Sequence, residues 1–323
     1  MKPLSAILWV LVPVSALAGV ALLAVAFGGP KDPPPMPSIN NPFKSVDFSG
    51  LPSVSHFVAR DGASLAFREY LPTEGAPRGS VVLVHGSSSQ GRSMHVVARA
   101  FAGAGYIAFA LDVRGHGESG ARGRIDYVGQ LEDDLEDFVR SVGMVQPATL
   151  VGFSAGGGFA LRFAGSERQK LFSGYVLLSP FISQDAPTYR KNAGGWVSVG
   201  IPRLIALTLF NAAGIHAFND LAVVKFALSE EVKSFLTPYY SFALALNFRP
   251  QRDYRANIRA VGQPLRVVAG EADEVHYADR FAGVFKAEGK DVPVTLVPGI
   301  GHIPLTLDPV AVQAAVAAVK SLN

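Results

Sequence analysis

The sequence contains no cysteine, and this absence excludes disulfide bonds, thiolate catalysis and cysteine-ligated metal sites. Charged residues are scarce as well, at 17% of the 323 residues, and the formal net charge is only +3. No block of lysine and arginine and no nucleic-acid-binding motif is present, so the charge does not indicate a nucleic-acid partner. We expect stability to come from the packing of apolar residues, which make up 49% of the chain.

The longest apolar run lies at the amino terminus. Residues 4–27 carry no charge, and this run exceeds the roughly 20 residues that span a bilayer. We therefore predict a membrane anchor within residues 1–29, and the few flanking charges favour an internal amino terminus with the rest of the chain on the non-cytoplasmic side. Two alternatives stay open. Ala16-Leu17-Ala18 resembles the cleavage site of a secretory signal, after which the chain would be secreted, and the run is also compatible with a buried helix.

A proline-rich segment follows the apolar run. Residues 30–52 include Pro33-Pro34-Pro35-Met36-Pro37, which is typical of a stiff polyproline spacer, so we predict a linker here. The remaining residues, 53–323, are enough for one large domain with an insertion.

Short apolar runs alternate with longer amphipathic ones from Ser53 onward, a pattern typical of a sheet whose parallel strands are joined by helices. Asp61-Gly62 suits a tight turn between two antiparallel entry strands. The predicted strands are 54–59, 64–70, 81–84, 107–111, 149–151, 175–178, 265–269 and 292–297. The fold class is therefore α/β, with a mostly parallel central sheet flanked by helices.

One stretch breaks this rhythm. Residues 181–255 are rich in Phe, Tyr, Leu and Ala, with scattered Gly and Pro, so we predict a helical insertion. Its place between two strands puts it above the carboxyl ends of the sheet, where open α/β sheets bind ligands. We expect it to form a cap.

A candidate nucleophile lies in Gly152-Phe153-Ser154-Ala155-Gly156, which has the pattern G-x-S-x-G directly after a strand and before a helix-like run. Glycines at these two positions let strand and helix backbones approach closely, and the serine then projects at the end of the strand. The sequence therefore predicts Ser154 as the nucleophile.

A serine hydroxyl needs a base within hydrogen-bond reach and a third group that orients the base. His302 follows the last strand in a loop with two glycines and is the predicted base, with His276 and His216 as alternatives. Asp273 follows the preceding strand and is the predicted acid, with Glu271 and Glu274 as alternatives. The resulting order of Ser, Asp and His is that of the α/β hydrolases.

Backbone amides are expected to stabilise the oxyanion. His85-Gly86-Ser87 ends the strand at 81–84, where the oxyanion loop of this architecture belongs, so the amides of Ser87 and Ala155 are the predicted donors. The imidazole of His85 is expected to brace the loop. The segment 112–119, dense in polar side chains, is interpreted as structural, with binding of a substrate carboxylate by Arg114 or His116 as the alternative. The acidic run 132–137 is predicted to be a solvated helix face, and no metal or organic cofactor is implied.

With these residues in view, the chain resembles the α/β-hydrolase superfamily, and within it the monoacylglycerol lipase and lysophospholipase-like serine hydrolases. The resemblance rests on His85-Gly86, the segment 112–119, Gly152 to Gly156, Asp273 and Gly301-His302, in the order of the family. It implies a triad of Ser154, Asp273 and His302, and an oxyanion hole formed by Ser87 and Ala155.

The leading hypothesis is therefore hydrolysis of a small carboxylic ester, lipid-derived in view of the apolar cap and the amino-terminal run, through an acyl-enzyme. Amidase, aminopeptidase or acyltransferase chemistry on the same triad is the first alternative. The second is a non-catalytic, membrane-associated binding module. The sequence does not indicate the oligomeric state.

Overall fold

The computed structural model describes residues 16–36, 38, 41–191 and 195–322. Two sheets are formed within these residues. The larger sheet comprises β1 (Ser55–Val58), β2 (Ser64–Tyr70), β3 (Ser80–Val84), β4 (Ile107–Leu111), β5 (Ala148–Phe153), β6 (Gly174–Leu178), β10 (Leu265–Gly270) and β11 (Val294–Val297). The smaller sheet comprises β7 (Val197–Val199), β8 (Ala222–Phe226) and β9 (Tyr239–Ser241).

The strands of the large sheet lie in the order β1-β2-β4-β3-β5-β6-β10-β11. The strands from β4 to β11 are mutually parallel, whereas β1 and β2 form the antiparallel entry hairpin and β2 pairs antiparallel with β4. This arrangement confirms the predicted α/β-hydrolase fold with its mostly parallel sheet. All parallel strands therefore end at one edge, and the residues that follow them converge there.

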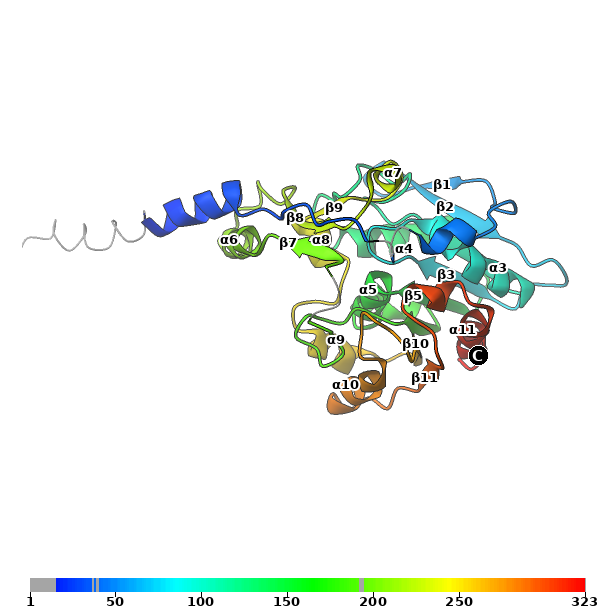
Figure 1. Ribbon diagram of the computed structural model, residues 1–323. Coiled ribbons are helices and arrows are strands. Elements are labelled where there is room, and N and C mark those ends of the chain that lie inside the picture. The colour runs from blue at the N-terminus through cyan, green and yellow to red at the C-terminus, as the bar shows by residue number, and fades with distance from the viewer. Residues whose placement is uncertain (1–15, 37, 39–40, 192–194, 323) are drawn as a thin grey trace, which may run out of the picture.

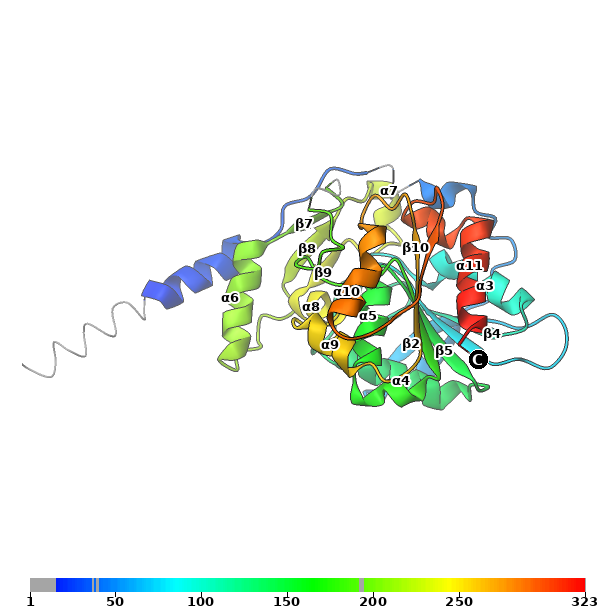
Figure 2. The same ribbon diagram turned by 90° about the horizontal axis from the view of Figure 1, so that it is seen from below.

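Helices cover both faces of the large sheet (Figure 1, Figure 2). The α-helices are α3 (His95–Gly103), α4 (Gln130–Val142), α5 (Ala155–Ala164), α6 (Ile201–Ala212), α7 (Glu230–Lys233), α8 (Phe242–Asn247), α9 (Tyr254–Ala260), α10 (Phe281–Ala287) and α11 (Pro309–Lys320). Short 3-10 helices are η1 (Pro42–Ser45), η2 (Gly91–Met94), η3 (Glu167–Leu171), η4 (Ala278–Arg280) and η5 (Ile303–Thr306). Apolar residues of α3 and α11 pack on one face, and those of α4, α5, α9 and α10 pack on the other.

Strand β3 illustrates why the sheet is so apolar. Val82 and Val84 face the core on the α5 side, whereas Val81 and Leu83 face the core on the α3 side, and all four are fully buried. A strand covered on both faces needs apolar residues at consecutive positions rather than at alternate ones. This is why the continuous run at 81–84 predicted the strand correctly.

The cap differs from its prediction. Residues 181–255 contain the helices α6, α7 and α8, but they also contain the small antiparallel sheet β7-β8-β9. Each of these strands has only three to five residues, too few for an alternating pattern to stand out from the aromatic and aliphatic residues around it. The cap is therefore mixed rather than purely helical.

The amino-terminal prediction needs correction. In the part of the chain that the structure describes, no helix is both long enough and apolar enough to cross a membrane. The described helix covers residues 16–27 and measures about 18 Å at roughly 1.5 Å per residue, short of the roughly 30 Å of a bilayer core. The first fifteen residues of the predicted segment lie outside the described residues. The predicted location, anchored in a membrane with the catalytic domain on the non-cytoplasmic side, is therefore contradicted.

Part of this apolar run packs against the cap instead. Val25 is buried in a small cluster with Leu207 of α6, Val223 of β8 and Phe242 of α8. The guanidinium of Arg203 donates hydrogen bonds to the carbonyl oxygens of Val25 and Ala26. Figure 1 and Figure 2 both show this helix beside α6, at the side of the molecule away from α11.

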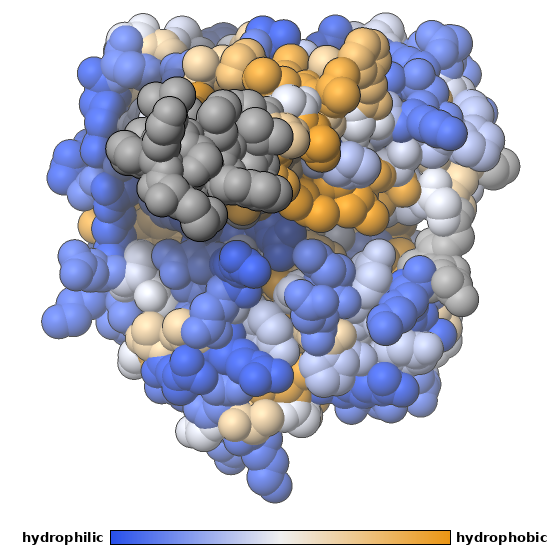
Figure 3. Space-filling model, turned by 90° about the vertical axis from the view of Figure 1, so that its left-hand side faces the viewer, coloured by the Kyte–Doolittle hydropathy of each residue, from blue (hydrophilic) through white to orange (hydrophobic). Residues whose placement is uncertain are grey.

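Apolar side chains remain exposed on the outer surfaces of these two helices. Figure 3 views the molecule from this side and shows hydrophobic surface gathered over part of it. The exposed residues are Leu17, Val20, Leu22, Leu23 and Phe27 on the first helix and Ile201, Ile205 and Leu209 on α6. One side of the helix at residues 16–27 thus packs on the cap, and its other side is exposed.

The predicted linker, residues 30–52, runs along the domain in its described part. Asp32 forms an ion pair of 2.8 Å with Lys225 of β8, and the amide of Met36 donates to the carbonyl oxygen of Ala227 at 3.0 Å. Pro37, within the proline run, lies outside the described residues, as do residues 39–40. The predicted linker therefore contacts the cap before the chain enters the large sheet at β1.

Candidate active site

Ser154 lies at the sharp turn between β5 and α5. Its φ of 53° and ψ of −116° place it in a region that residues other than glycine rarely adopt. A Cβ atom on Gly152 would collide with the carbonyl oxygen of Gly156, and one on Gly156 would collide with the carbonyl oxygens of Val84 and His85. The two glycines of the motif are therefore required by the close approach of strand and helix, as the sequence predicted.

His302 is delivered to this serine by the loop after β11. Its Nε2 lies 3.0 Å from Ser154 Oγ, and its Nδ1 lies 2.8 Å from Asp273 Oδ2. The backbone amide of His302 donates to Glu274 Oε2 at 2.9 Å, and the imidazole packs on the ring of Phe153 at 4.9 Å between centroids. The structure thus brings the three predicted residues into one hydrogen-bonded row.

Asp273 is almost completely buried in the loop after β10. Its Oδ1 accepts hydrogen bonds of 2.8 Å from the amides of Val275 and His276, and its Oδ2 accepts a bond of 2.6 Å from the hydroxyl of Ser179. Burial by itself raises the pKa of a carboxyl group, but the attraction of His302 and the neighbouring His276 outweighs it and holds the pKa of Asp273 well below its usual range. The carboxylate is therefore charged and oriented.

The alternatives considered for these roles lie elsewhere. Glu271 is exposed, and Glu274 uses a carboxylate oxygen to accept the amide of His302. His216 is exposed in the cap, where its Nδ1 pairs with Asn211 Oδ1 at 2.7 Å. Among the described residues, neither Glu271 nor Glu274 forms a hydrogen bond with the imidazole of His302.

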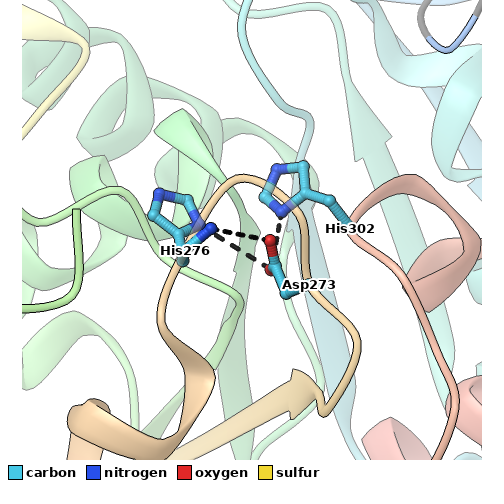
Figure 4. A group of neighbouring side chains, drawn as sticks. All are labelled: Asp273, His276 and His302. Carbon is cyan, nitrogen blue, oxygen red and sulfur yellow. Dashed lines mark hydrogen bonds and ion pairs between the residues drawn. The ribbon is translucent and has the colours of Figure 1, made fainter. Parts of the chain in front are cut away.

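His276 is the exception, because it lies beside the row. Its ring is buried, its centroid lies 5.1 Å from that of His302, and its Nδ1 lies 3.8 Å from Asp273 Oδ2 (Figure 4). Within the described residues, neither of its ring nitrogens has a hydrogen-bond partner. Burial lowers its pKa, so the ring is neutral.

Asp273, His276 and His302 are also the group that could hold a metal ion. Their ligand atoms all lie within 4.8 Å of one another. A metal there would compete for His302 Nδ1, which already bonds to Asp273. Asp273 and His302 already have partners in the hydrogen-bonded row to Ser154, so their positions are explained without a metal.

The loop after β3 carries the first predicted oxyanion donor. Ser87 lines the cavity above Ser154. The next residue, Ser88, has a φ of 65°, and its amide donates to Tyr240 Oη at 2.7 Å. Two further hydrogen bonds join Ser88 to Thr237. Ser88 Oγ donates to the carbonyl oxygen of Thr237 at 2.7 Å, and the amide of Thr237 donates to the carbonyl oxygen of Ser88 at 2.8 Å. The cap therefore holds this loop in place.

The second predicted donor, Ala155, is the first residue of α5. Amides in the first turn of a helix have no carbonyl partner within the helix and carry its positive end. This amide is therefore available near Ser154 Oγ. Its role, like that of Ser87, stays a prediction.

Buried histidines brace the loop from below. His85 Nε2 accepts the amide of Val113 at 3.3 Å, and His116 Nε2 accepts the hydroxyl of Tyr240 at 2.7 Å. Burial lowers the pKa of both histidines, so each is neutral and can accept these bonds. Arg114 forms ion pairs with Asp134 at 2.7 Å and with Asp61 at 2.9 Å. The contacts of this segment are thus internal, in line with its structural interpretation. Asp134 is buried, as is Glu132, so the prediction of a solvated helix face at 132–137 is wrong for these two residues.

Sequence reasoning missed Ser179, Thr237 and Tyr240. Ser179 directly follows β6, and a polar residue at the carboxyl end of a buried strand was a signal that could have found it. Thr237 and Tyr240 lie in the cap, and no local pattern links them to a loop some 150 positions earlier.

A cavity of about 240 Å³ opens above Ser154 and His302. Much of its lining is apolar and comes from two separate segments. Those segments contribute Met36, Phe43 and Phe48 from the amino-terminal side and Trp196, Phe235 and Leu236 from the cap. The cavity thus combines the serine, the base and the predicted donor Ser87 with a mainly apolar lining.

Comparisons with known proteins agree with this architecture. Residues 75–308 match the model of the family described as serine aminopeptidase, S33. The monoacylglycerol lipase of Mycolicibacterium smegmatis is 33% identical over 141 residues, which cover 42% of this chain and 49% of that protein. The monoglyceride lipase of Mus musculus is 29% identical over 178 residues, which cover 52% of this chain and 57% of that protein. The chain thus matches about half the length of these curated relatives.

Among solved structures, a soluble variant of monoglyceride lipase from Saccharomyces cerevisiae, in complex with a substrate analogue, superposes with a TM-score of 0.64 at 19% identity. The superposition covers 87% of this chain and 98% of that one. At this identity the likeness concerns the fold.

Proposed function

The chain belongs to the serine aminopeptidase S33 family of α/β hydrolases and is a lipase- or esterase-type enzyme related to monoglyceride lipases, and we propose that it hydrolyses single-chain, lipid-derived carboxylic esters through an acyl-enzyme on Ser154. The observation that carries this proposal is the row Ser154–His302–Asp273 beside a cavity whose lining is mainly apolar.

The first step uses the short contacts of this row. His302 Nε2 accepts the proton of Ser154 Oγ as the oxygen attacks the ester carbonyl carbon, and Asp273 stabilises the imidazolium that forms. The negative charge that develops on the carbonyl oxygen is stabilised by the amides of Ser87 and Ala155, each donor being worth about 3 kcal/mol in measured cases. His302 then gives its proton to the leaving alcohol.

The second step releases the acid. Water attacks the acyl-enzyme, His302 accepts a proton from this water, and Ser154 leaves with that proton restored. Both steps use the same imidazole, which explains why its orientation by Asp273 matters twice.

The apolar lining supports a hydrocarbon chain as the substrate's non-reacting part. Burying a methylene group contributes about 0.8 kcal/mol, so a chain placed against the aromatic side chains of the cavity would gain affinity with each carbon. A cavity of about 240 Å³ is smaller than the roughly 300–1,000 Å³ of drug-sized ligand sites, and this favours one chain rather than two.

The test is labelling of the purified protein with a fluorophosphonate probe, followed by hydrolysis of p-nitrophenyl esters. We expect labelling of the wild type and its loss in Ser154→Ala and His302→Ala, with kcat reduced on the order of 10⁴-fold or more. The variant His216→Ala, which alters an exposed histidine of the cap, is the matched control and should label normally. A wild type that neither labels nor turns over would overturn the proposal and favour a binding module.

The family description also makes amide and peptide cleavage a competing activity. Amino-acid p-nitroanilides with a free amino group test it on the same preparations. A higher kcat/KM on these than on acyl esters would replace the esterase proposal by an aminopeptidase, and acyl transfer would appear as ester product when a second alcohol is added.

A further inference from the structure

A segment before the family-matched region reaches the candidate active site. We define the strap as Met36 together with residues 41–48, whereas the family match begins at residue 75. At its start the strap is joined to the cap by the bond from the amide of Met36 to Ala227. Beyond its end, the guanidinium of Arg68 on β2 donates to the carbonyl oxygen of Pro52. The chain is therefore attached to the domain at the start of the strap and again four residues beyond its end.

Aromatic side chains of the strap lie at the cavity. Phe43 and Phe48 both line it and are both partly exposed. The guanidinium carbon of Arg92 lies 4.4 Å from the ring centroid of Phe48, and the ring of His95 lies 5.8 Å away. Phe48 is thus held by two neighbouring side chains where it lines the cavity.

The cap completes the same wall. Arg92 also lies 5.9 Å from the ring of Phe235 on the cap side, so one guanidinium lies between an aromatic ring of the strap and one of the cap. Strap and cap thus both contribute aromatic rings to the cavity that Ser154 lines, and Arg92 connects two of them.

Charges on the cavity lining are balanced. Lys44 and Arg92 carry positive charge, and Glu231 and Glu274 carry negative charge. This balance gives no preference for a charged head group, and the apolar rings remain as the feature that distinguishes one substrate from another.

We propose that the strap is the wall on which the substrate's hydrocarbon chain binds, and that Phe43 and Phe48 determine the chain-length selectivity of the enzyme. This inference rests on the proposed esterase function. Each methylene that reaches the rings should raise kcat/KM roughly fourfold, because burying it contributes about 0.8 kcal/mol. Short acyl groups end before the wall and should not respond to it.

The experiment measures kcat/KM for p-nitrophenyl acetate, butyrate, octanoate and dodecanoate. In Phe43→Ala and Phe48→Ala we expect about a tenfold loss on the longest chains, seen mainly in KM, and less than a twofold change on acetate. Phe48→Leu keeps an apolar surface and should recover most of the loss. Leu71→Ala removes an exposed apolar side chain outside the cavity and is the matched control.

Folding and function are separated by two further readouts. Each variant is melted and labelled with a short-chain fluorophosphonate, so that a misfolded variant is recognised by loss of both signals. In that case the wild-type series carries the test, because a kcat/KM that does not rise with chain length would contradict a wall for the hydrocarbon chain. Losses of the same factor on all four esters, or unchanged selectivity in both alanine variants, would overturn the strap proposal while leaving the esterase standing. A wild type that hydrolyses no ester and fails to label would overturn both.

Discussion

Ser179 donates its hydroxyl hydrogen to Asp273 Oδ2 at 2.6 Å, the same oxygen that accepts from His302 Nδ1. Both donors are buried, and together they hold this oxygen with two hydrogen bonds. In a row of hydrogen bonds, the position of the carboxylate determines the position of the imidazole. Ser179 is therefore a positioning residue for the candidate base.

Removing this bond should slow catalysis without weakening substrate binding. For Ser179→Ala we expect a fall in kcat of about tenfold, with KM within twofold of the wild type, because a misplaced imidazole affects the chemical step. Steady-state kinetics on p-nitrophenyl butyrate measures this. Ser173→Ala, whose hydroxyl bonds to Gln146 on the surface, is the control, and an equal fall in that variant would contradict the assignment.

Tyr240 joins the cap to the loop of the predicted oxyanion donor. Its hydroxyl accepts the amide of Ser88 and donates to His116 Nε2, both at 2.7 Å. Tyr240→Phe leaves both partners buried and unpaired, so we expect a loss of about 1–3 kcal/mol in the free energy of unfolding and about a tenfold fall in kcat. Urea unfolding and ester kinetics measure the two effects.

The adjacent tyrosine offers a matched control for this change. The hydroxyl of Tyr239 accepts an exposed hydrogen bond of 3.3 Å from Arg124, so Tyr239→Phe should leave both quantities nearly unchanged. If the two variants behave alike, the oxyanion loop does not depend on the cap.

His276 should not replace His302 as the base. It has no contact with Ser154 in the described structure, and its Nδ1 lies 3.8 Å from Asp273. We expect His276→Gln to keep kcat within about tenfold of the wild type and to label with the fluorophosphonate, whereas His302→Ala does neither. Equal inactivity of both variants would give His276 a part in proton transfer.

The buried histidines predict a loss of stability in acid. Burial lowers the folded-state pKa of His85, His116 and His276 below the ordinary value of 6.5. Below pH 6.5 the unfolded chain therefore binds protons that the folded chain does not, and the free energy of unfolding falls as the pH decreases. The slope is up to about 1.4 kcal/mol per pH unit for each such histidine.

Urea unfolding at pH 8, 6.5 and 5 measures this dependence. These three histidines should leave the free energy of unfolding unchanged between pH 8 and pH 6.5. At pH values below 6.5 the free energy of unfolding should decrease. His116→Gln, which removes one titrating group, should be less stable at pH 8 but show a shallower fall. A free energy of unfolding that stays constant down to pH 5 would contradict the buried neutral state.

Much of the fold follows from neighbours in the sequence. The eight strands of the large sheet match the predicted runs closely. Burial extends along nearly all of β3, β4, β5, β6 and β10, and a strand buried on both faces requires a continuous apolar stretch that is visible locally. The turn at Ser154 is equally local, since the collision of a Cβ atom at Gly152 or Gly156 involves residues within the motif or on the adjoining strand. The candidate nucleophile, acid and base could likewise be named from the sequence, because each follows a strand that the local pattern predicts.

Contacts between residues that are far apart in the sequence could be seen only in the tertiary structure. Ser154 and His302 are 148 positions apart, and the choice of Asp273 over Glu271 and Glu274 depends on which loop residue points at that imidazole. Hydropathy alone did not show that part of the amino-terminal run packs on α6, and the predicted anchor was accordingly contradicted.

The aromatic strap and the bond between Tyr240 and Ser88 have no sequence signal either, because each joins segments whose residues are ordinary in their own surroundings. The sequence by itself determined the strands, the strained turn and the chemical groups, which depend on short-range sterics and burial. Only the folded chain determined which of those groups meet and which side chains enclose the cavity, because such contacts depend on how distant segments pack together.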